Sequence, residues 1–335
     1  MATVRIRRLD GTGDPGYPAW FAAYDAGLAH DFPGGPHWLE HELRVVYEPS
    51  DIHATALWAA EDADGTVVGA AAVALPLKDN TSLAEVALAV RPEARGRGVG
   101  SALLDAVHDE ARRQGRSRFL ADVEGPLGTP QVPGIRFAER HGYTRRMDEV
   151  LRVQRPPFDL DRLARLEREA AAHAVDYRIL TWRDRIPDEH VAEYARLAAR
   201  LSTDEPRDQL DYEPETWDVA RLRLVEERRA RMRRHAWQAA ALAPDGTIAG
   251  QTTVALPAIG DDTGMQGATI VDPRHRGHRL GLLLKIANLR RVLADRPGVR
   301  TLWTWNAASN TYMIAVNERL GYVPAGWVAR YQLDG

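Results

Sequence analysis

The sequence predicts two tandem α/β (α+β) domains, each with a mixed, mostly antiparallel twisted sheet flanked by helices. Three observations carry this prediction: a length of 335 residues, a repeat at an offset of 181 residues, and a glycine-rich turn that follows an apolar strand pattern in both copies. The length exceeds that of one ordinary core and suits two domains. Hydrophobic residues make up 44% and charged residues 27%, so we expect both domains to be packed and globular.

The repeat covers whole domains. Segment 64–104 aligns without gaps on 245–285, and 15 of these 41 pairs are identical. Downstream, ERHGY (139–143) matches ERLGY (318–322). Solenoid repeats recur about every 20–50 residues. The much longer spacing here therefore indicates a duplicated domain.

Both copies predict the same order of elements. In the first copy, apolar runs at 54–61 and 66–76 flank an Asp-Gly pair, which is typical of a hairpin. A third strand then leads through the glycine turn into a helix whose apolar residues, Leu103, Leu104 and Val107, have helical spacing. A further strand and helix follow, and final strands are expected near 143–153 and 322–333.

We place an N-terminal domain at 1–154, a helical linker at 155–176 and a C-terminal domain at 177–335. Two adjacent prolines end the first domain, and an aspartate after them is suited to cap the linker helix. A second charged helix is expected at 214–234, with a solvated face.

Composition limits the possible partners. The net charge of −3 argues against a general nucleic-acid binder. No apolar run approaches the roughly 20 residues that span a bilayer, and the N-terminus has no apolar signal core. We therefore expect a soluble, cytoplasmic protein with neither a nucleic-acid nor a membrane partner. There is no cysteine, so a transferred group must pass directly between substrates or through a weaker nucleophile.

The glycine turn is suited to bind phosphate. In VRPEARGRGVG (90–100), bare backbone precedes a helix whose first N–H groups have no partner within the helix. These groups and the helix dipole attract anions. Arg95 adds positive charge. The turn lacks the lysine and the spacing of a nucleotide-triphosphate loop, and it follows a meander instead of the first strand–helix unit of a dinucleotide fold.

On these residues the sequence resembles the GCN5-related N-acetyltransferases (GNAT), as two tandem domains over nearly the whole chain. The resemblance rests on VRPEARGRGVGSALL, VDPRHRGHRLGLLLK, ERHGY and NERLGY. It implies transfer of an acetyl group from acetyl-coenzyme A (acetyl-CoA) directly to an amine in a ternary complex, with no metal. The acceptor is expected to be a small molecule, although an aminoglycoside-like antibiotic and a protein amino group stay open. The alternative is a CoA-binding module in which one or both copies have lost catalysis.

The resemblance places the pyrophosphate of acetyl-CoA at both turns and its pantetheine arm along the preceding strands, 84–90 and 265–271. The implied cofactor-binding residues of the first copy are Val90, Arg95, Gly96, Arg97, Gly98, Val99 and Gly100. Those of the second copy are Val271, Arg276, Gly277, His278, Arg279, Leu280 and Gly281, with Asn306 and Asn310 at the acyl end. Arg279 replaces Gly98, so that it either narrows the anion site or points away and adds charge.

Catalytic residues follow the family less closely. Ala138 and Asn317 stand where relatives have a tyrosine general acid. The leaving thiolate is therefore expected to be protonated by another group or by water, or to be stabilised by a hydrogen bond from Asn317. Glu85 lies on the strand that carries a glutamate base in some relatives. In the second copy an acidic segment at 201–215 is expected to orient a cationic acceptor, through Asp204, Glu205, Asp208 and Asp211.

These features favour the second copy as the catalytic one. It has Asn306, whereas the first copy has the anionic Glu124 at that position. A separate motif, HWLEH (37–41), matches a zinc-protease pattern. Because a five-residue match is common and no third ligand stands out, we interpret it as a surface or pocket-lining pair.

Overall fold

The computed structural model describes residues 4–204, 206–260 and 262–335, in two compact units. Unit 1 contains the residues up to Glu149, together with Arg207–Glu213 and Gly326–Gly335. Unit 2 contains Val150–Pro206 and Pro214–Ala325. The units thus differ from the two sequence copies, because each includes a strand from the other copy.

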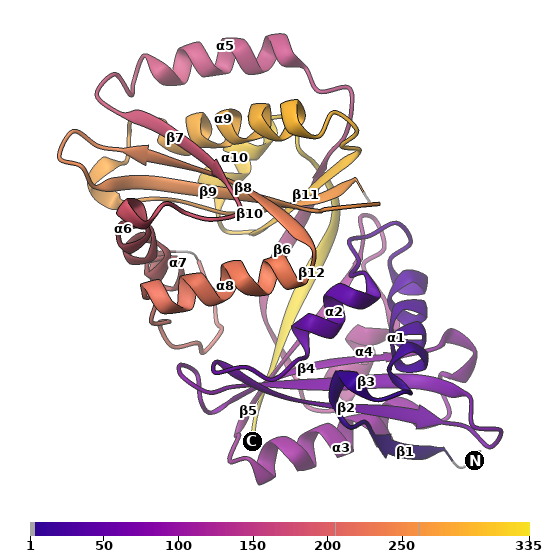
Figure 1. Cartoon of the computed structure of the whole chain (residues 1–335). Helices are drawn as coiled ribbons and strands as arrows, with labels where there is room; N and C mark the ends of the chain where they lie inside the picture. The colour runs from indigo at the N-terminus through magenta and orange to yellow at the C-terminus, as the bar shows by residue number, and fades with distance from the viewer. Residues whose placement is uncertain (1–3, 205, 261) are drawn as a thin grey trace. The chain divides into compact units, whose positions relative to one another are not determined.

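Unit 1 is a mixed sheet between helices. The strands, in spatial order, are β1 (Arg5–Arg8), β2 (His53–Glu61), β3 (Val67–Pro76), β4 (Leu83–Val90), β5 (Arg118–Pro126), β12 (Val323–Asp334) and the beginning of β6 (Thr144–Gln154). Only β4 and β5 run parallel. Helices α1 (Tyr17–Asp31) and α2 (Glu40–Val46) cover one face and α3 (Val99–Arg113) covers the other (Figure 1), where α4 (Pro133–Arg140) joins the same core.

The helices of unit 1 have the faces that their spacing predicts. In α3, Leu103, Leu104 and Val107 are buried against β3 and β4, which confirms the predicted stripe. On the opposite face, Tyr17 and Trp20 of α1 are fully buried. Each face of the sheet therefore has its own hydrophobic core.

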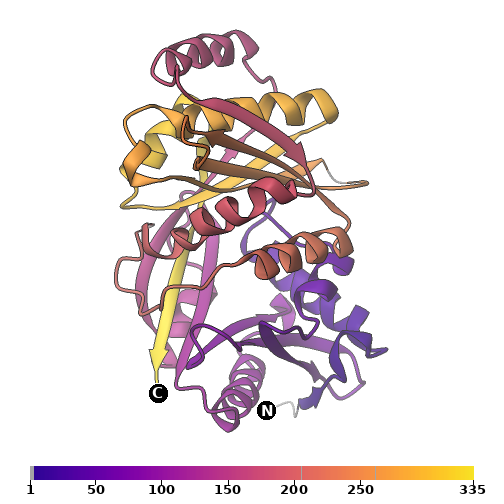
Figure 2. The ribbon, with the colours of Figure 1, turned by 60° about the vertical axis from the view of Figure 1, so that its left-hand side comes forward.

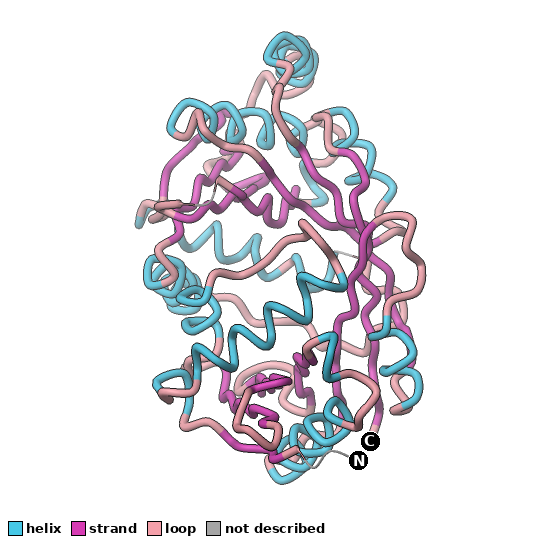
Figure 3. The backbone as a smooth tube through the Cα atoms, turned by 90° about the vertical axis from the view of Figure 1, so that its right-hand side faces the viewer, coloured by secondary structure: helices cyan, strands magenta, loops and turns pink. Residues whose placement is uncertain are grey.

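Unit 2 has the same architecture. Its strands, in spatial order, are β7 (Arg178–Arg183), β8 (Arg234–Leu242), β9 (Ile248–Pro257), β10 (Thr263–Val271), β11 (Thr301–Ala307) and the end of β6 (Thr144–Gln154). Helices α5 (Leu160–Ala171) and α9 (Leu280–Asp295) lie on one face, and α6 (Asp188–Ala199) and α8 (Val219–Arg231) lie on the other (Figure 1). The remaining helices are the short α7 (Leu201–Asp204) and α10 (Thr311–Arg319). Figure 3 shows the strands in magenta and the helices in cyan.

Capping residues set the helix boundaries that the sequence left open. The Asp159 side chain accepts a hydrogen bond from the Arg162 N–H, so α5 begins at Leu160. Asp218 caps α8 in the same way, and this helix therefore begins five residues later than the predicted 214. Among the residues described, every helix is too short or too polar to cross a membrane.

The final strand completes the sheet of unit 1. β12 pairs with β5 over nine residues, from Gly326 opposite Pro126 to Asp334 opposite Arg118 (Figure 2). Tyr331 is 0% exposed in the core of unit 1. The predicted strand at 322–333 is present, but its assignment to unit 1 was not predicted. Both sheets are mixed and mostly antiparallel, which confirms the predicted fold class.

We expect Tyr331→Ala to unfold unit 1, although Tyr331 belongs to the second copy in the sequence. Loss of a buried aromatic side chain costs about 3–5 kcal/mol of unfolding free energy. Urea denaturation combined with limited proteolysis will report which unit opens first. Val323→Ala is the control, because Val323 lies on the same strand at 55% exposure. Initial cleavage within 215–320 in Tyr331→Ala would contradict the assignment of β12 to unit 1.

Candidate functional site

Two parallel strands separate at the centre of unit 1. β4 and β5 are paired only from Leu83 and Arg118 to Val86 and Ala121. Beyond Val86, β4 stays paired with β3 on its other side, while β5 stays paired with β12. At 87–90, the edge of β4 therefore directs its backbone hydrogen-bonding groups towards an opening between the two strands.

The first glycine turn, residues 95–100, follows this edge. Gly96 and Gly98 have φ of +74° and +88°, a left-handed conformation that favours glycine. Val99 is 2% exposed and anchors the start of α3, whereas Gly96, Arg97 and Gly98 are exposed. The backbone N–H groups at the start of α3 thus lie at a surface turn, as an anion site requires.

Gly100 has a packing role that the sequence did not reveal. A Cβ atom there would lie 3.0 Å from the Phe137 ring of α4, so the glycine lets α4 approach α3. The aligned Gly281 has more space, with the nearest atom, on Val271, at 3.8 Å from such a Cβ.

The second turn, residues 276–281, repeats the backbone shape. β10 and β11 separate after Met265 and Trp303, and Gly277 and Arg279 have φ of +89° and +53°. A left-handed non-glycine residue costs about 1–2 kcal/mol. The Arg279 guanidinium lies 3.9 Å from the Glu169 carboxylate of α5, so this side chain is directed towards the linker helix. His278 contacts the His173 carbonyl oxygen through Nδ1, at 3.0 Å.

Carboxylates from β5 face the α1 side of unit 1. Ala121 and Val123 pack into the α3 core, so the alternating Asp122 and Glu124 project from the opposite face. Burial is the main cause that raises the pKa of Glu124 to about 7, and the charge of Asp122 contributes in the same direction. The Asp-x-Glu alternation in the strand pattern was the available sequence signal for this pair.

Other groups in unit 1 complete this face. Besides burial, the charges of Glu124 and Asp122 raise the pKa of Tyr24 of α1. The charge of Glu85 on β4 raises the pKa of Tyr47, which is hydrogen-bonded to Tyr24. Burial is the main cause that raises the pKa of both tyrosines, so they are neutral phenols at physiological pH.

β12, the strand of the second copy that belongs to unit 1, supplies a cation to the same face. Arg330 of β12 donates to Glu149 at 2.8 Å and lies 4.0 Å from Asp122. Sequence reasoning missed Tyr24, Tyr47 and Arg330, because they are distant in the chain from the turn.

In unit 2 the corresponding region is built from amides. Asn317 is 0% exposed and donates through Nδ2 to the Asn306 Oδ1 at 2.6 Å. Within the described residues, the Asn317 Oδ1 has no hydrogen-bond partner. Asn310 instead caps α10 by accepting from the Met313 N–H. Gln266, the counterpart of Glu85, donates to the Thr252 hydroxyl and to backbone carbonyls beside it.

The acidic segment predicted over the second copy divides between the two units. Asp208 and Asp211 belong to unit 1, where Asp211 pairs with Arg118 at 2.6 Å. Asp204 pairs with Arg200 and Arg276. Each described carboxylate named here thus pairs with an arginine or lies in the other unit, and Glu205 lies outside the described residues.

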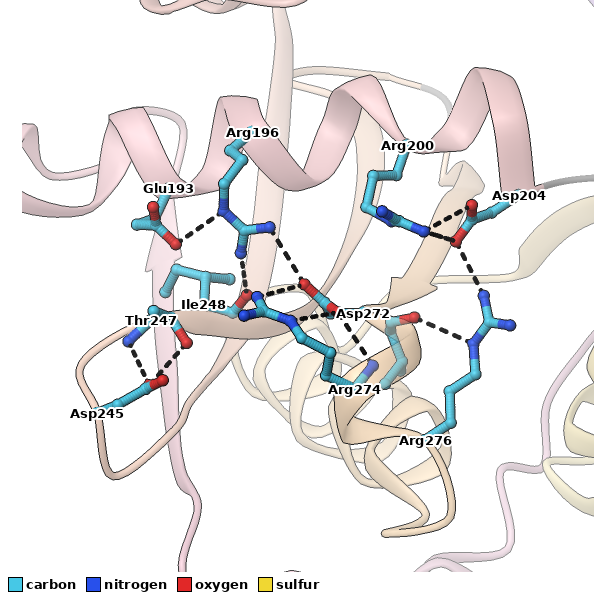
Figure 4. A network of polar contacts seen from close by, with 11 residues as sticks. Glu193, Arg196, Arg200, Asp204, Asp245, Thr247, Ile248, Asp272, Arg274 and Arg276 are labelled. Carbon is cyan, nitrogen blue, oxygen red and sulfur yellow. Dashed lines mark hydrogen bonds and ion pairs between the residues drawn. The ribbon is translucent and has the colours of Figure 1, made fainter.

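Ion pairs tie α6 and α7 to segment 272–276, which leads into the second turn (Figure 4). Arg276 donates to Asp204 at 2.9 Å, and Arg196 donates to Asp272 at 3.1 Å. The hydrogen bond from the Arg274 side chain is the main cause that holds the pKa of Asp272 well below its usual range. Arg95 in the first turn likewise pairs with Asp31, at 2.7 Å.

The HWLEH segment lacks the geometry of a zinc motif. α2 begins at Glu40, so His37 precedes the helix and does not share a helical face with His41. Across 4–204, 206–260 and 262–335, no three His, Cys, Asp or Glu side chains gather as metal ligands.

Comparisons with known proteins agree with this geometry. Residues 53–145 match the acetyltransferase (GNAT) domain family. A tandem GNAT protein from the clavulanic acid biosynthesis pathway is 29% identical, with a TM-score of 0.79 and 98% of each chain covered. A GCN5-related N-acetyltransferase from Sphaerobacter thermophilus has a TM-score of 0.65 at 17% identity, covering 100% of this chain and 97% of its own. No curated protein matches the sequence.

We expect Glu124 to make stability fall as the pH rises from about 4.5 to about 7. Over this range the folded protein keeps a proton that the unfolded chain has released, because the folded-state pKa is raised from 4.5 to about 7. Glu124→Gln should therefore gain stability relative to the wild type between pH 5 and pH 8 in urea denaturation. Asp122→Asn should show a smaller change in the same direction. Parallel stability curves for Glu124→Gln and the wild type would contradict the raised pKa.

Proposed function

Because the chain is a tandem member of the GCN5-related N-acetyltransferase superfamily, we propose that unit 1 transfers an acetyl group from acetyl-CoA directly to an amine of a small-molecule acceptor. The fold supports acyl transfer from an acyl-CoA. The observation that carries the choice of unit is the position of Asp122 and Glu124, which face the α1 side beside the opening between β4 and β5.

The donor site that we propose uses backbone groups. The N–H groups that follow Gly96 and Gly98 receive the pyrophosphate at the start of α3. The open edge of β4 at 87–90 offers hydrogen bonds to the pantetheine amides. These contacts direct the thioester into the opening between the strands.

The chemistry requires a proton acceptor for the incoming ammonium. Glu124 has a pKa of about 7, close to the optimum for a general base at neutral pH. The amine nitrogen forms a bond to the thioester carbonyl carbon, the carbon–sulfur bond breaks, and the sulfur leaves with the electron pair. Glu124 accepts the proton that the ammonium loses before the attack, and the second nitrogen proton passes to solvent as the amide forms. The thiolate takes a proton from solvent because Ala138 replaces the tyrosine of relatives.

The choice of unit 1 reverses the preference from sequence. The acidic segment expected over the second copy divides between Arg118, Arg200 and Arg276, and Asn310 acts as a helix cap. Glu124, which as a fixed anion would repel the donor, has a raised pKa. The remaining acyl-end residues of unit 2, Asn306 and Asn317, carry no titratable group.

A second candidate function is CoA binding without catalysis, which Ala138 favours because it removes the usual general acid. The two functions differ in one observable. Both predict binding of acetyl-CoA, whereas only the enzyme releases free thiol with an amine.

We expect Gly98→Glu to abolish thiol release, because a carboxylate at the first turn repels the pyrophosphate. The matched control is Arg279→Glu, which places the same side chain at the aligned position of the second turn and should retain most activity. Thiol release will be followed with acetyl-CoA and a panel of small amines, after thermal unfolding confirms that both variants fold. Loss of activity in Arg279→Glu alone would assign the reaction to unit 2.

We expect kcat/KM to rise as the pH increases through about 7, because the carboxylate form of Glu124 accepts the proton. Glu124→Gln should remove this rise of kcat/KM with pH, the ascending limb of the pH profile, and lower kcat about 100-fold or more. Glu85→Gln is the comparison, and it should retain the limb. A limb that persists in Glu124→Gln and disappears in Glu85→Gln would identify Glu85 as the base.

A further inference from the structure

Arg95 is held entirely by neighbouring protein groups. Its Nε donates to the Val90 carbonyl oxygen at 3.0 Å. Its Nη1 donates to Asp31 at 2.7 Å, and its Nη2 donates to Asp31 and to the Gly27 carbonyl oxygen, each at 3.1 Å. All three nitrogens of the guanidinium are therefore engaged, in a bidentate carboxylate pair and two backbone contacts.

These contacts join two elements with different tasks. Gly27 and Asp31 belong to the last turns of α1, the helix that carries Tyr24 beside the carboxylates. Val90 is the last residue of β4, five residues before the first turn begins at Arg95. Arg95 thus connects the acceptor side of the site with the donor side.

An independent feature marks the same place. A Cβ atom on Gly27 would lie 2.9 Å from the Ala89 Cβ and 3.2 Å from the Val90 carbonyl oxygen. The helix therefore approaches β4 as closely as a bare backbone allows. Arg95 closes over this contact, with its side chain and that of Asp31 each 23% exposed.

Unit 2 has only part of this arrangement. Arg276 contacts the Val271 carbonyl oxygen at 3.4 Å and Asp204 at 2.9 Å, and its side chain is 56% exposed. Its carboxylate partner is shared with Arg200. The arginine of the second turn is thus more weakly fixed.

We propose that Arg95 is a positioning residue that fastens α1 to the end of β4 and does not itself bind the phosphates of the donor. This assignment rests on the proposed function of unit 1. In this proposal the backbone N–H groups of the turn, and not Arg95, bind the phosphates. Asp31 is its partner in this role, since it fixes the guanidinium in a bidentate geometry that lysine does not reproduce.

The two roles for Arg95 predict opposite effects of Asp31→Asn. If Arg95 positions α1 and β4, then Asp31→Asn and Arg95→Met each weaken acetyl-CoA binding by about tenfold, and the double variant is no weaker than either single one. If Arg95 binds phosphate, Asp31→Asn tightens binding, because it frees a guanidinium and removes a negative charge. Isothermal titration with acetyl-CoA measures these affinities.

Two further comparisons separate positioning from general destabilisation. Arg95→Lys keeps the charge but not the three-way contact, so it should weaken binding as Arg95→Met does. Arg95→Met and Asp31→Asn should lower kcat/KM by the same factor with acetyl-CoA and with acetyl-pantetheine, which lacks the pyrophosphate. Arg97→Met, at the exposed arginine two residues away, should affect acetyl-CoA alone.

The outcomes distinguish a failure of the positioning role from a failure of the proposed function. Tighter or unchanged binding in Asp31→Asn, or full affinity in Arg95→Lys, would overturn the positioning role and leave the proposed function intact. Absence of acetyl-CoA binding in the wild type would overturn both.

Discussion

The separation of β4 from β5 after Val86 is the constraint on which the site depends. Parallel strands normally satisfy their backbone groups against each other, so an opening between them must be supported on both sides. β3 holds β4 and β12 holds β5, and each of these pairings continues past the point of separation. The opening is therefore a stable part of the sheet, with one free backbone edge directed into it.

The exchange of strands between the two copies, in which β12 joins unit 1 and the end of β6 joins unit 2, is part of this support. Without Gly326–Asp334, β5 would be an edge strand with a free backbone on both sides beyond Ala121. The same strand brings Arg330 to the carboxylates of unit 1. In unit 2 the end of β6 has the equivalent place beside β11, where Gln154 donates to the Leu320 carbonyl oxygen at 2.6 Å. Each unit thus depends on residues that belong to the other copy in the sequence.

Local patterns were sufficient to predict much of this fold. The spacing of Leu103, Leu104 and Val107 fixed the buried face of α3, and the glycines fixed the turn before it. The strand at 322–333 was also correct, but a strand pattern is compatible with either sheet, so the exchange was not predictable. The partners of a charge are equally non-local: nothing beside Arg95 points to Asp31, which precedes it by 64 residues. For the same reason the sequence did not show that the acidic segment at 201–215 divides between the two units.

The exchange also governs the order in which the chain can fold during synthesis. The 200 residues from Pro126 to Gly326 separate the ends of two paired strands, and ribosomes add about 5–20 residues per second. The edge of β5 therefore waits about 10–40 s for its partner. During that interval it presents unpaired backbone groups that another nascent chain can join. Slow translation of the second copy, or a stop within it, thus exposes the first copy to aggregation through β5, although the residues of the first copy are already synthesised.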